Sequence, residues 1–307
     1  MARRLLSGNL LTIAIACCLT ATAQTATVKQ QVLPLLTTAW GQDAPYNLLC
    51  PTKTNANGKP QHCRVGCVAC AMGQVMRYYR YPEVGIGTGT NLFNASLTAD
   101  FGNTYYAWAD MAERYTAGSY SDAEAEAVAT LLYHCGVALN MIYGLESSST
   151  FTAFANNMTT ALVRYFGYDD TTLRSVSRSK YSRDEWLQLI REELSAGRPI
   201  IYTGTSPTMG GHTWVVDGYD DEGRIHMNWG WTGRSDGYYD IDLTNVRGLD
   251  FSQKQSMVIG IRPPLASRIT PHSTFNTPRV YSLGGRPVTQ PMRKGIYLIE
   301  GKKRIIK

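Results

Sequence analysis

The spacing of the apolar residues changes once along this chain of 307 residues, near Pro199, and no other feature constrains the fold as strongly. Before Pro199 the apolar residues recur at helical spacing, in residues 67–81, 121–135, 151–166 and 182–194. After Pro199 short apolar runs alternate with Gly and Asp turns, in residues 200–203, 212–217, 224–229 and 237–242. Helices that come first and strands that come last predict an α+β protein rather than a repeating βαβ sheet.

Two of the predicted helices start at capping boxes, in which a serine and a glutamate three residues later each bond the other's backbone N–H group. These boxes are Ser121–Glu124 and Ser182–Glu185. Gly197 and Pro199 end the second of these helices, because glycine adopts the left-handed conformation found after a helix and proline cannot continue one.

The N-terminus has the three parts of a secretory signal peptide. A short basic region, Met1–Arg4, precedes the apolar run Leu10–Leu19, which is too short to span a membrane, and the small residues Ala21–Ala23 follow. We therefore predict a signal peptide over residues 1–23 and a secreted protein without a transmembrane span. An alternative takes Cys17 as a lipoprotein processing site, which would anchor the protein to a membrane.

The end of the chain differs in composition from the rest. Pro263-Pro264 marks a boundary, a proline-bounded linker follows, and short apolar runs separated by glycines complete the chain. We predict a main domain over residues 24–265, and a linker and small β-rich tail over residues 266–307. A tail of about three strands is too small to form a core alone.

The composition excludes several classes of protein. Hydrophobic residues make up 44% and charged residues 18%, which is typical of a globular protein and not of a disordered one. The net charge is +6, and Lys and Arg are scattered over most of the chain, so we predict no nucleic-acid partner. Five of the seven cysteines follow the signal peptide: Cys50, Cys63, Cys67, Cys70 and Cys135. An odd number in an exported protein leaves at least one thiol unpaired.

Cys67 lies where the first predicted helix begins, directly after Gly66. At a helix N-terminus the positive end of the helix dipole and the unpaired backbone N–H groups lower the pKa of a thiol and favour the thiolate. Gly66 permits a tight entry into the helix that exposes the sulfur. Cys67 is therefore a candidate nucleophile, and a small buried core residue is the alternative.

His212 precedes an apolar strand and follows Gly210 and Gly211, which keep its approach open. An imidazole there can take a proton from the thiol and later protonate a leaving amine. Asn228 lies downstream, and an amide that accepts from the imidazole N–H would fix the tautomer and orientation of the ring. A nucleophilic cysteine followed far downstream by histidine and asparagine is the order of papain-like peptidases.

Gln61 lies shortly before Cys67, where its amide could donate to an oxyanion together with the Cys67 backbone N–H. We predict a cysteine peptidase in which Cys67 is the nucleophile, His212 the base, Asn228 the orienting residue and Gln61 an oxyanion donor. This chemistry requires no metal and no organic cofactor. The structural alternatives are a surface glutamine, a histidine satisfied in the core and an asparagine in a turn.

Several segments together resemble the streptopain family of secreted bacterial, papain-like cysteine peptidases. The matching segments are residues 45–51, 61–62, 66–69, 74–76, 81–82, 211–218, 226–231 and 235–238. The resemblance implies a two-lobed fold with a helical lobe and an antiparallel β lobe. It also implies an endopeptidase that acts on proteins or peptides and prefers a hydrophobic residue two positions before the cleaved bond. The four residues above would keep their roles, and Trp229 would shield the His–Asn contact from water or simply pack in the core.

The chain departs from this family in two ways. Members usually carry a long inhibitory propeptide, and we expect that domain to be absent here. Cys63 and Cys70 flank the nucleophile and are not part of the family motif. A disulfide between Cys50 and Cys63 is one option that the sequence leaves open.

Three segments near the C-terminus, residues 280–286, 294–298 and 301–303, resemble the sorting domain of type IX secretion in Bacteroidetes. This resemblance implies a Gram-negative source, a surface-bound or released protein, and the bacterial secretion machinery as a partner. A plain β-hairpin tail is the alternative.

Other functions would use the same residues differently. Cys63, Cys67 and Cys70 have the spacing of the cysteines that ligate the iron–sulfur cluster of radical SAM enzymes, and Cys67 with Cys70 could form a redox pair. The cluster conflicts with export to an oxidising compartment, and it leaves His212 and Asn228 unexplained. The scaffold could also serve as a catalytically silent binding module, and a transglutaminase-like acyl transferase would use the same Cys–His chemistry.

Overall fold

A computed structural model describes residues 27–150, 155–208, 210–242, 245–265, 280–282, 295–299 and 302–306. The predicted signal peptide, the alternative acylation site Cys17 and the linker over residues 266–279 lie outside the described residues. Within the described part of the chain, no helix is long and apolar enough to cross a membrane.

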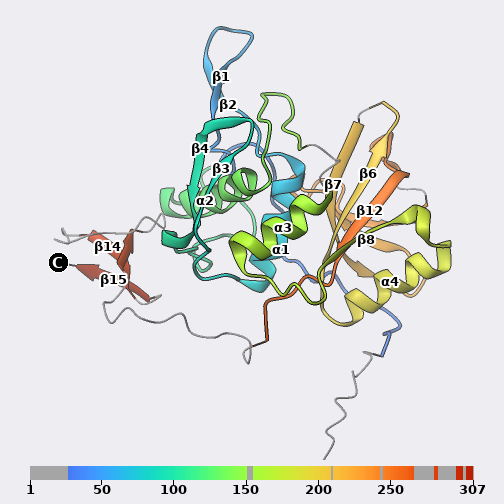
Figure 1. Cartoon of the computed structure of the whole chain (residues 1–307). Coiled ribbons are helices and arrows are strands. Elements are labelled where there is room, and N and C mark those ends of the chain that lie inside the picture. Colours follow the sequence, from blue (N-terminus) through green and yellow to red (C-terminus); the bar gives the residue numbers. More distant parts are fainter. Residues whose placement is uncertain are drawn as a thin grey trace, which may run out of the picture.

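The main domain consists of a helical lobe and a sheet lobe (Figure 1). The helical lobe contains α1 (Cys67–Tyr79), α2 (Asp122–Ala138) and α3 (Ala155–Phe166). The sheet lobe contains a six-stranded sheet and α4 (Arg183–Ser195), which packs on one face of it. The predicted α+β, two-lobed architecture is confirmed.

The six strands of the main sheet are all antiparallel to their neighbours and follow the order β5-β12-β6-β7-β8-β9. Their bounds are β5 (Arg174–Ser177), β6 (Ile200–Ser206), β7 (Gly210–Tyr219), β8 (Ile225–Asn228), β9 (Gly237–Tyr239) and β12 (Gln253–Ile259). The four predicted strand runs are confirmed as β6 to β9, with somewhat different ends.

The sequence analysis missed β5 and β12, and both have a physical reason to be inconspicuous. β5 is a short, polar edge strand with no fully buried side chain. In β12 the register shifts between Gln253 and Ser256, which interrupts the alternation of buried and exposed side chains.

Short hairpins complete the fold. They are β1 (Thr52–Thr54) with β2 (Pro60–His62), β3 (Thr88–Asn91) with β4 (Asn94–Asp100), and β10 (Asn245–Val246) with β11 (Leu249–Asp250). The tail forms a three-stranded antiparallel sheet of β13 (Val280–Ser282), β14 (Gly295–Ile299) and β15 (Lys302–Ile306). The predicted β-rich tail is thus present, and its sorting role stays a prediction.

The predicted helix boundaries agree with the capping geometry. Ser121 and Ser182 both form complete capping boxes, with Glu124 and Glu185 respectively. Each cap stabilises its helix by about 1 kcal/mol, because it satisfies backbone N–H groups that have no partner within the helix. These caps set where α2 and α4 begin.

Each lobe has its own apolar core, and α1 lies at the boundary between them. Met72, Val75 and Met76 of α1 pack into the helical core, whereas Trp186 and Trp214 pack into the core between α4 and the sheet. α1 also packs against β7. The start of α1 and the start of β7 therefore meet at one place between the lobes.

Candidate active site

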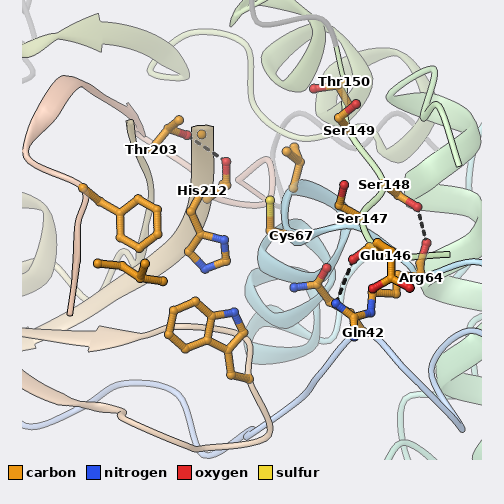
Figure 2. Close-up of a pocket in the computed structure, with 16 residues that line it drawn as sticks. Gln42, Arg64, Cys67, Glu146, Ser147, Ser148, Ser149, Thr150, Thr203 and His212 are labelled. Atoms are coloured by element: carbon orange, nitrogen blue, oxygen red, sulfur yellow. Dashed lines mark hydrogen bonds between the residues drawn. The ribbon is translucent and has the colours of Figure 1, made fainter. Parts of the chain in front are cut away.

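A pocket between the two lobes contains both Cys67 and His212 (Figure 2). Its wall from the sheet lobe contains the large apolar side chains of the lining other than Val68, and its wall from the helical lobe is largely polar. The lining residues on the sheet side include Thr203, Gly211, Thr213, Trp231, Leu249 and Phe251, and those on the helical side include Gln42, Arg64, Val68 and residues 146–150.

Cys67 is the first residue of α1, and its side chain is partly exposed to the pocket. The preceding Gly66 has a φ of 92°, which favours glycine. A Cβ at Gly66 would also lie 2.8 Å from the terminal methyl group of Met141 and 3.2 Å from the Cβ of Ser148. The sequence prediction that Gly66 permits the tight entry into the helix is therefore confirmed, and the sulfur lies at the positive end of the helix dipole.

His212 is 7% exposed and lies near the start of β7. Its Nε2 lies 3.0 Å from the backbone carbonyl oxygen of Trp229. Because a carbonyl oxygen only accepts, Nε2 must carry the proton in this hydrogen bond. The neutral ring therefore has its lone pair on Nδ1, and this tautomer is the one a base needs to take a proton from another group.

Aromatic side chains surround the His212 ring. The rings of Trp214 and Trp229 lie nearly parallel to it, at centroid distances of 6.0 and 6.1 Å, and Trp231 and Phe251 lie at 4.9 and 5.4 Å. Trp229 is fully buried. These rings exclude water from the imidazole and restrict its rotation. Trp229 packs in the core beside the ring, which was the alternative to the predicted shielding role.

Burial acts on both members of the Cys–His pair. It raises the pKa of the Cys67 thiol, against hydrogen bonds involving the backbones of Thr213 and Val68, and it lowers the pKa of His212 to about 4, against the bond to the Trp229 carbonyl. Each of these pKa changes applies to one group that becomes charged while the other stays neutral. Transfer of the thiol proton to the imidazole creates two opposite charges in one pocket, and their attraction offsets the desolvation that opposes either charge by itself.

The predicted hydrogen bond between Asn228 and the imidazole is wrong. Asn228 is buried, but its Oδ1 accepts from Gln74 Nε2 at 3.0 Å and from the Gly230 backbone N–H at 3.2 Å. Its Nδ2 donates to the backbone carbonyl of Thr38 at 2.7 Å. The carbonyl of the following residue, Trp229, takes the place that was predicted for the Asn228 amide, because β8 ends at Asn228 and the chain turns there.

The backbone of Trp229 is held from a second side. Its N–H donates to Asp236 Oδ1 at 2.9 Å. Burial raises the pKa of the Asp236 carboxyl to about 6, whereas the bond to Trp229 lowers it. Trp229 therefore presents its carbonyl to His212 from a position that is fixed on both sides.

The prediction that Gln61 serves as the oxyanion donor is also wrong in its geometry. Gln61 is exposed in the middle of β2, where its Oε1 accepts from Asn55 Nδ2 at 3.1 Å. It is not among the residues that line the pocket. The residues between Gln61 and Cys67 run as an irregular segment after the hairpin, so proximity along the sequence does not bring this side chain to the thiol.

A different glutamine, Gln42, lines the pocket with Cys67 and His212 (Figure 2). Its backbone carbonyl accepts from the N–H of Val65 at 3.0 Å, which holds the segment beside the entry into α1. The sequence analysis missed it, although it lies only three residues before the segment 45–51 that carried part of the family resemblance.

The profile of the peptidase C10 family matches residues 40–239. The chain belongs to the peptidase C10 family. Streptopain of Streptococcus pyogenes serotype M28 (strain MGAS6180) is 33% identical over 268 residues, which cover 78% of this chain and 65% of streptopain. The thiol protease/hemagglutinin PrtT of Porphyromonas gingivalis is 36% identical over 239 residues, which cover 73% of this chain and 26% of PrtT. The chain thus spans less than two thirds of the length of these curated relatives.

Two solved structures share this fold. Active wild-type interpain A cysteine protease of Prevotella intermedia matches with a TM-score of 0.68 and 41% identity, over 75% of this chain and 95% of interpain A. A prointerpain A fragment from the same organism matches with a TM-score of 0.67 and 39% identity, over 78% of this chain and 74% of the fragment. The predicted resemblance to the streptopain family is confirmed.

The other four cysteines of this C10 chain are buried. Cys63 lies at the base of the β1–β2 hairpin, where its N–H donates to Pro51, and Cys70 Sγ donates to the Gly41 carbonyl at 3.5 Å. Cys50, Cys63, Cys67, Cys70 and Cys135 are free thiols, so the possible Cys50–Cys63 disulfide is not formed. Among the described residues no three metal-ligating side chains gather, so Cys63, Cys67 and Cys70 do not form the ligand set that the iron–sulfur alternative requires.

Proposed function

We propose that this chain is a cysteine endopeptidase in which Cys67 attacks a peptide carbonyl and His212 handles the proton. One observation carries the proposal: a thiol at a helix N-terminus shares a pocket with an imidazole whose Nε2–H is already donated to the Trp229 carbonyl. That bond leaves Nδ1 of His212 as the available base. The protease names of the relatives agree with this assignment.

The proposed reaction has two stages. The Cys67 thiolate adds to the carbonyl carbon, and the imidazolium of His212 donates its proton to the leaving amine as the C–N bond breaks. Water then adds to the acyl-enzyme with His212 as general base, and the acid product leaves with regeneration of the thiol. We assign oxyanion stabilisation to the backbone N–H of Cys67 and the side-chain amide of Gln42.

The substrates we propose are unstructured segments of proteins or peptides. The sheet-side wall of the pocket offers Leu249, Phe251 and Trp231 to a side chain of the substrate. An apolar surface of this kind gains free energy by covering a hydrophobic residue. This supports the preference for a hydrophobic residue two positions before the cleaved bond.

We also propose that the protein is exported and is found secreted or on the cell surface of a Gram-negative bacterium. The supporting features are the signal-peptide pattern of residues 1–23 and the likeness of the tail to a type IX sorting domain. The bacterial secretion machinery would then be a partner, and anchoring through Cys17 is the alternative. Cell fractionation of the wild type and of a variant truncated after residue 265 separates these routes, since only a functional sorting tail makes export depend on residues 266–307.

The direct test is hydrolysis of casein by the full chain, with Cys67→Ala as the inactive variant and Cys70→Ala as the matched control. Cys70 lies one helical turn after Cys67 but is fully buried, so its loss should leave turnover within a few-fold of wild type. We expect thiol alkylation and Cys67→Ala to abolish cleavage. A folded wild-type protein that cleaves nothing and whose Cys67 resists alkylation would favour the binding-module alternative.

A further inference from the structure

Gln74 is a fully buried glutamine on the helix that carries Cys67, seven residues further along and therefore on nearly the same face. Its amide oxygen accepts two hydrogen bonds, which is its full capacity, and its amide nitrogen donates one of its two. Oε1 accepts from Thr38 Oγ1 at 2.9 Å and from the Trp40 backbone N–H at 3.1 Å, and Nε2 donates to Asn228 Oδ1 at 3.0 Å.

The orientation of both amides follows from their backbone partners. The N–H of Trp40 can only donate, so it requires the oxygen of Gln74. The carbonyl of Thr38 can only accept, so it requires the nitrogen of Asn228, which leaves Oδ1 of Asn228 facing Gln74 and the Gly230 N–H. The network therefore has one consistent arrangement.

This network ends on the group that orients His212. The Gly230 N–H, which donates to Asn228, belongs to the same peptide unit as the Trp229 carbonyl, which accepts from His212 Nε2. A continuous path of hydrogen bonds thus runs from Gln74 on α1 through Asn228 and this peptide to the imidazole. Hydrogen bonds in such a chain polarise one another, so a donor at Gly230 makes the Trp229 oxygen a better acceptor.

We propose that Gln74 is a positioning residue for His212: it ties the Cys67 helix, through Asn228, to the Trp229 peptide that accepts from the imidazole. The inference rests on the proposed peptidase function. An apolar side chain would fill the same buried space without the cost of desolvating an amide. The presence of glutamine here is therefore explained by the hydrogen-bond geometry that its amide imposes on Asn228 and the Trp229 peptide. Tyr78 and Tyr79 of α1 also bond the sheet side, through the carbonyls of Gly197 and Ile261, but the Gln74 network is the link that leads to the Trp229 peptide.

The network has two effects on the reaction. It holds Cys67 and His212 at a fixed relative position, and a displacement of about 1 Å between a nucleophile and its base lowers the rate roughly a hundredfold. It also stabilises the protonated imidazole through the polarised carbonyl, so its loss moves the alkaline limb of the pH–rate profile to lower pH. The titratable and charged groups near His212 are Cys67, Arg64 and Glu146 in the pocket, and Asp236, which accepts from the Trp229 backbone N–H. None of them is changed in the variants.

The test compares Gln74→Met with Gln255→Met in the full chain. Gln255 is a matched control because it is 3% exposed and donates to the Ile241 carbonyl at 3.0 Å within the sheet lobe, away from the pocket. Gln74→Met loses three buried hydrogen bonds and Gln255→Met loses one, so both variants are assayed below their melting temperatures. We expect only Gln74→Met to lower kcat/KM, by about ten- to a hundredfold, and only Gln74→Met to shift the alkaline limb to lower pH.

A second variant keeps the test decisive if Gln74→Met does not fold. Gln74→Glu retains the acceptor for Thr38 and Trp40, and its protonated carboxyl can still donate to Asn228, whereas its ionised form cannot. We expect its activity relative to wild type to rise as the pH falls. Equal losses in Gln74→Met and Gln255→Met with an unchanged alkaline limb, or a pH-independent Gln74→Glu, would overturn the inference. An inactive wild type would instead refute the proposed function.

Discussion

Two buried histidines, one in each lobe, look alike by most local measures and differ in what surrounds them. His134 in α2 and His212 in β7 are both 7% exposed, and burial lowers the pKa of each to about 4. The Nδ1 of His134 lies 2.9 Å from the hydroxyl of Tyr106. Burial and a lowered pKa therefore do not identify a catalytic histidine.

The difference lies in the partner and in access. His134 packs among Phe101, Tyr106 and Tyr133, and it does not line the candidate active site. His212 faces a pocket, and its bonded nitrogen is matched with a backbone carbonyl that cannot move independently of the fold. His134 is the hydrogen-bond partner of a buried tyrosine. His212 is held as the Nε2–H tautomer in a pocket that also contains a thiol.

The largest difference that we expect between the two histidines is in peptidase activity. His212→Ala should lower kcat/KM by about a thousandfold or more, because it removes both general base and general acid. His134→Leu should leave kcat/KM within about threefold of wild type at a temperature where both variants are folded. Peptide hydrolysis measured beside far-ultraviolet circular dichroism checks this, and a folded, active His212→Ala variant would remove His212 from the mechanism.

Gln42 and Gln61 allow a similar comparison for stabilisation of the oxyanion. Gln42→Ala should lower kcat by about a hundredfold, which is typical for the loss of one oxyanion donor. Gln61→Ala should have no measurable effect, since Gln61 lies outside the pocket. Steady-state kinetics of both variants decides the assignment, and the reverse result would restore the prediction made from sequence spacing.

For His134 the main effect should be on stability. His134→Leu leaves the hydroxyl of Tyr106, a side chain only 1% exposed, without its partner, and should destabilise the fold by about 1–3 kcal/mol. His134→Leu combined with Tyr106→Phe should recover most of this loss, because both polar partners are then gone. Urea unfolding of the single and double variants measures it, and a double variant that is less stable than His134→Leu alone contradicts this account.

The last prediction concerns how the stability contributed by His134 depends on pH. The pKa of His134 is lowered from its ordinary value of 6.5 to about 4, so the unfolded chain binds a proton in this window and the folded chain does not. Stability is therefore present at neutral pH and is lost as the pH falls from about 6.5 toward 4. Between pH 7 and 4.5 this should cost wild type about 2 kcal/mol more than His134→Leu. Urea unfolding of both proteins at pH 7 and pH 4.5 measures this. An equal loss of stability in wild type and His134→Leu would exclude the effect.

The sequence by itself determined the parts of this protein that depend on one element at a time. The change of apolar spacing near Pro199 predicted a helical lobe followed by a sheet lobe, and the capping boxes located the starts of α2 and α4. The pairing of Gly66 with Cys67 marked the helix start, and Gly210–His212 marked the start of β7. Propensity, capping and glycine conformation act over a few residues, so they can be read along the chain.

The tertiary structure decided which groups complete the site. Gln42 enters the pocket and Gln61 does not, because the path of the chain around the β1–β2 hairpin carries the nearer glutamine away from Cys67. The imidazole bonds the carbonyl of Trp229 instead of the amide of Asn228, because the chain turns where β8 ends. Backbone groups exist at every residue and leave no mark in a sequence, so only the packing of the two lobes selects the one that contacts His212.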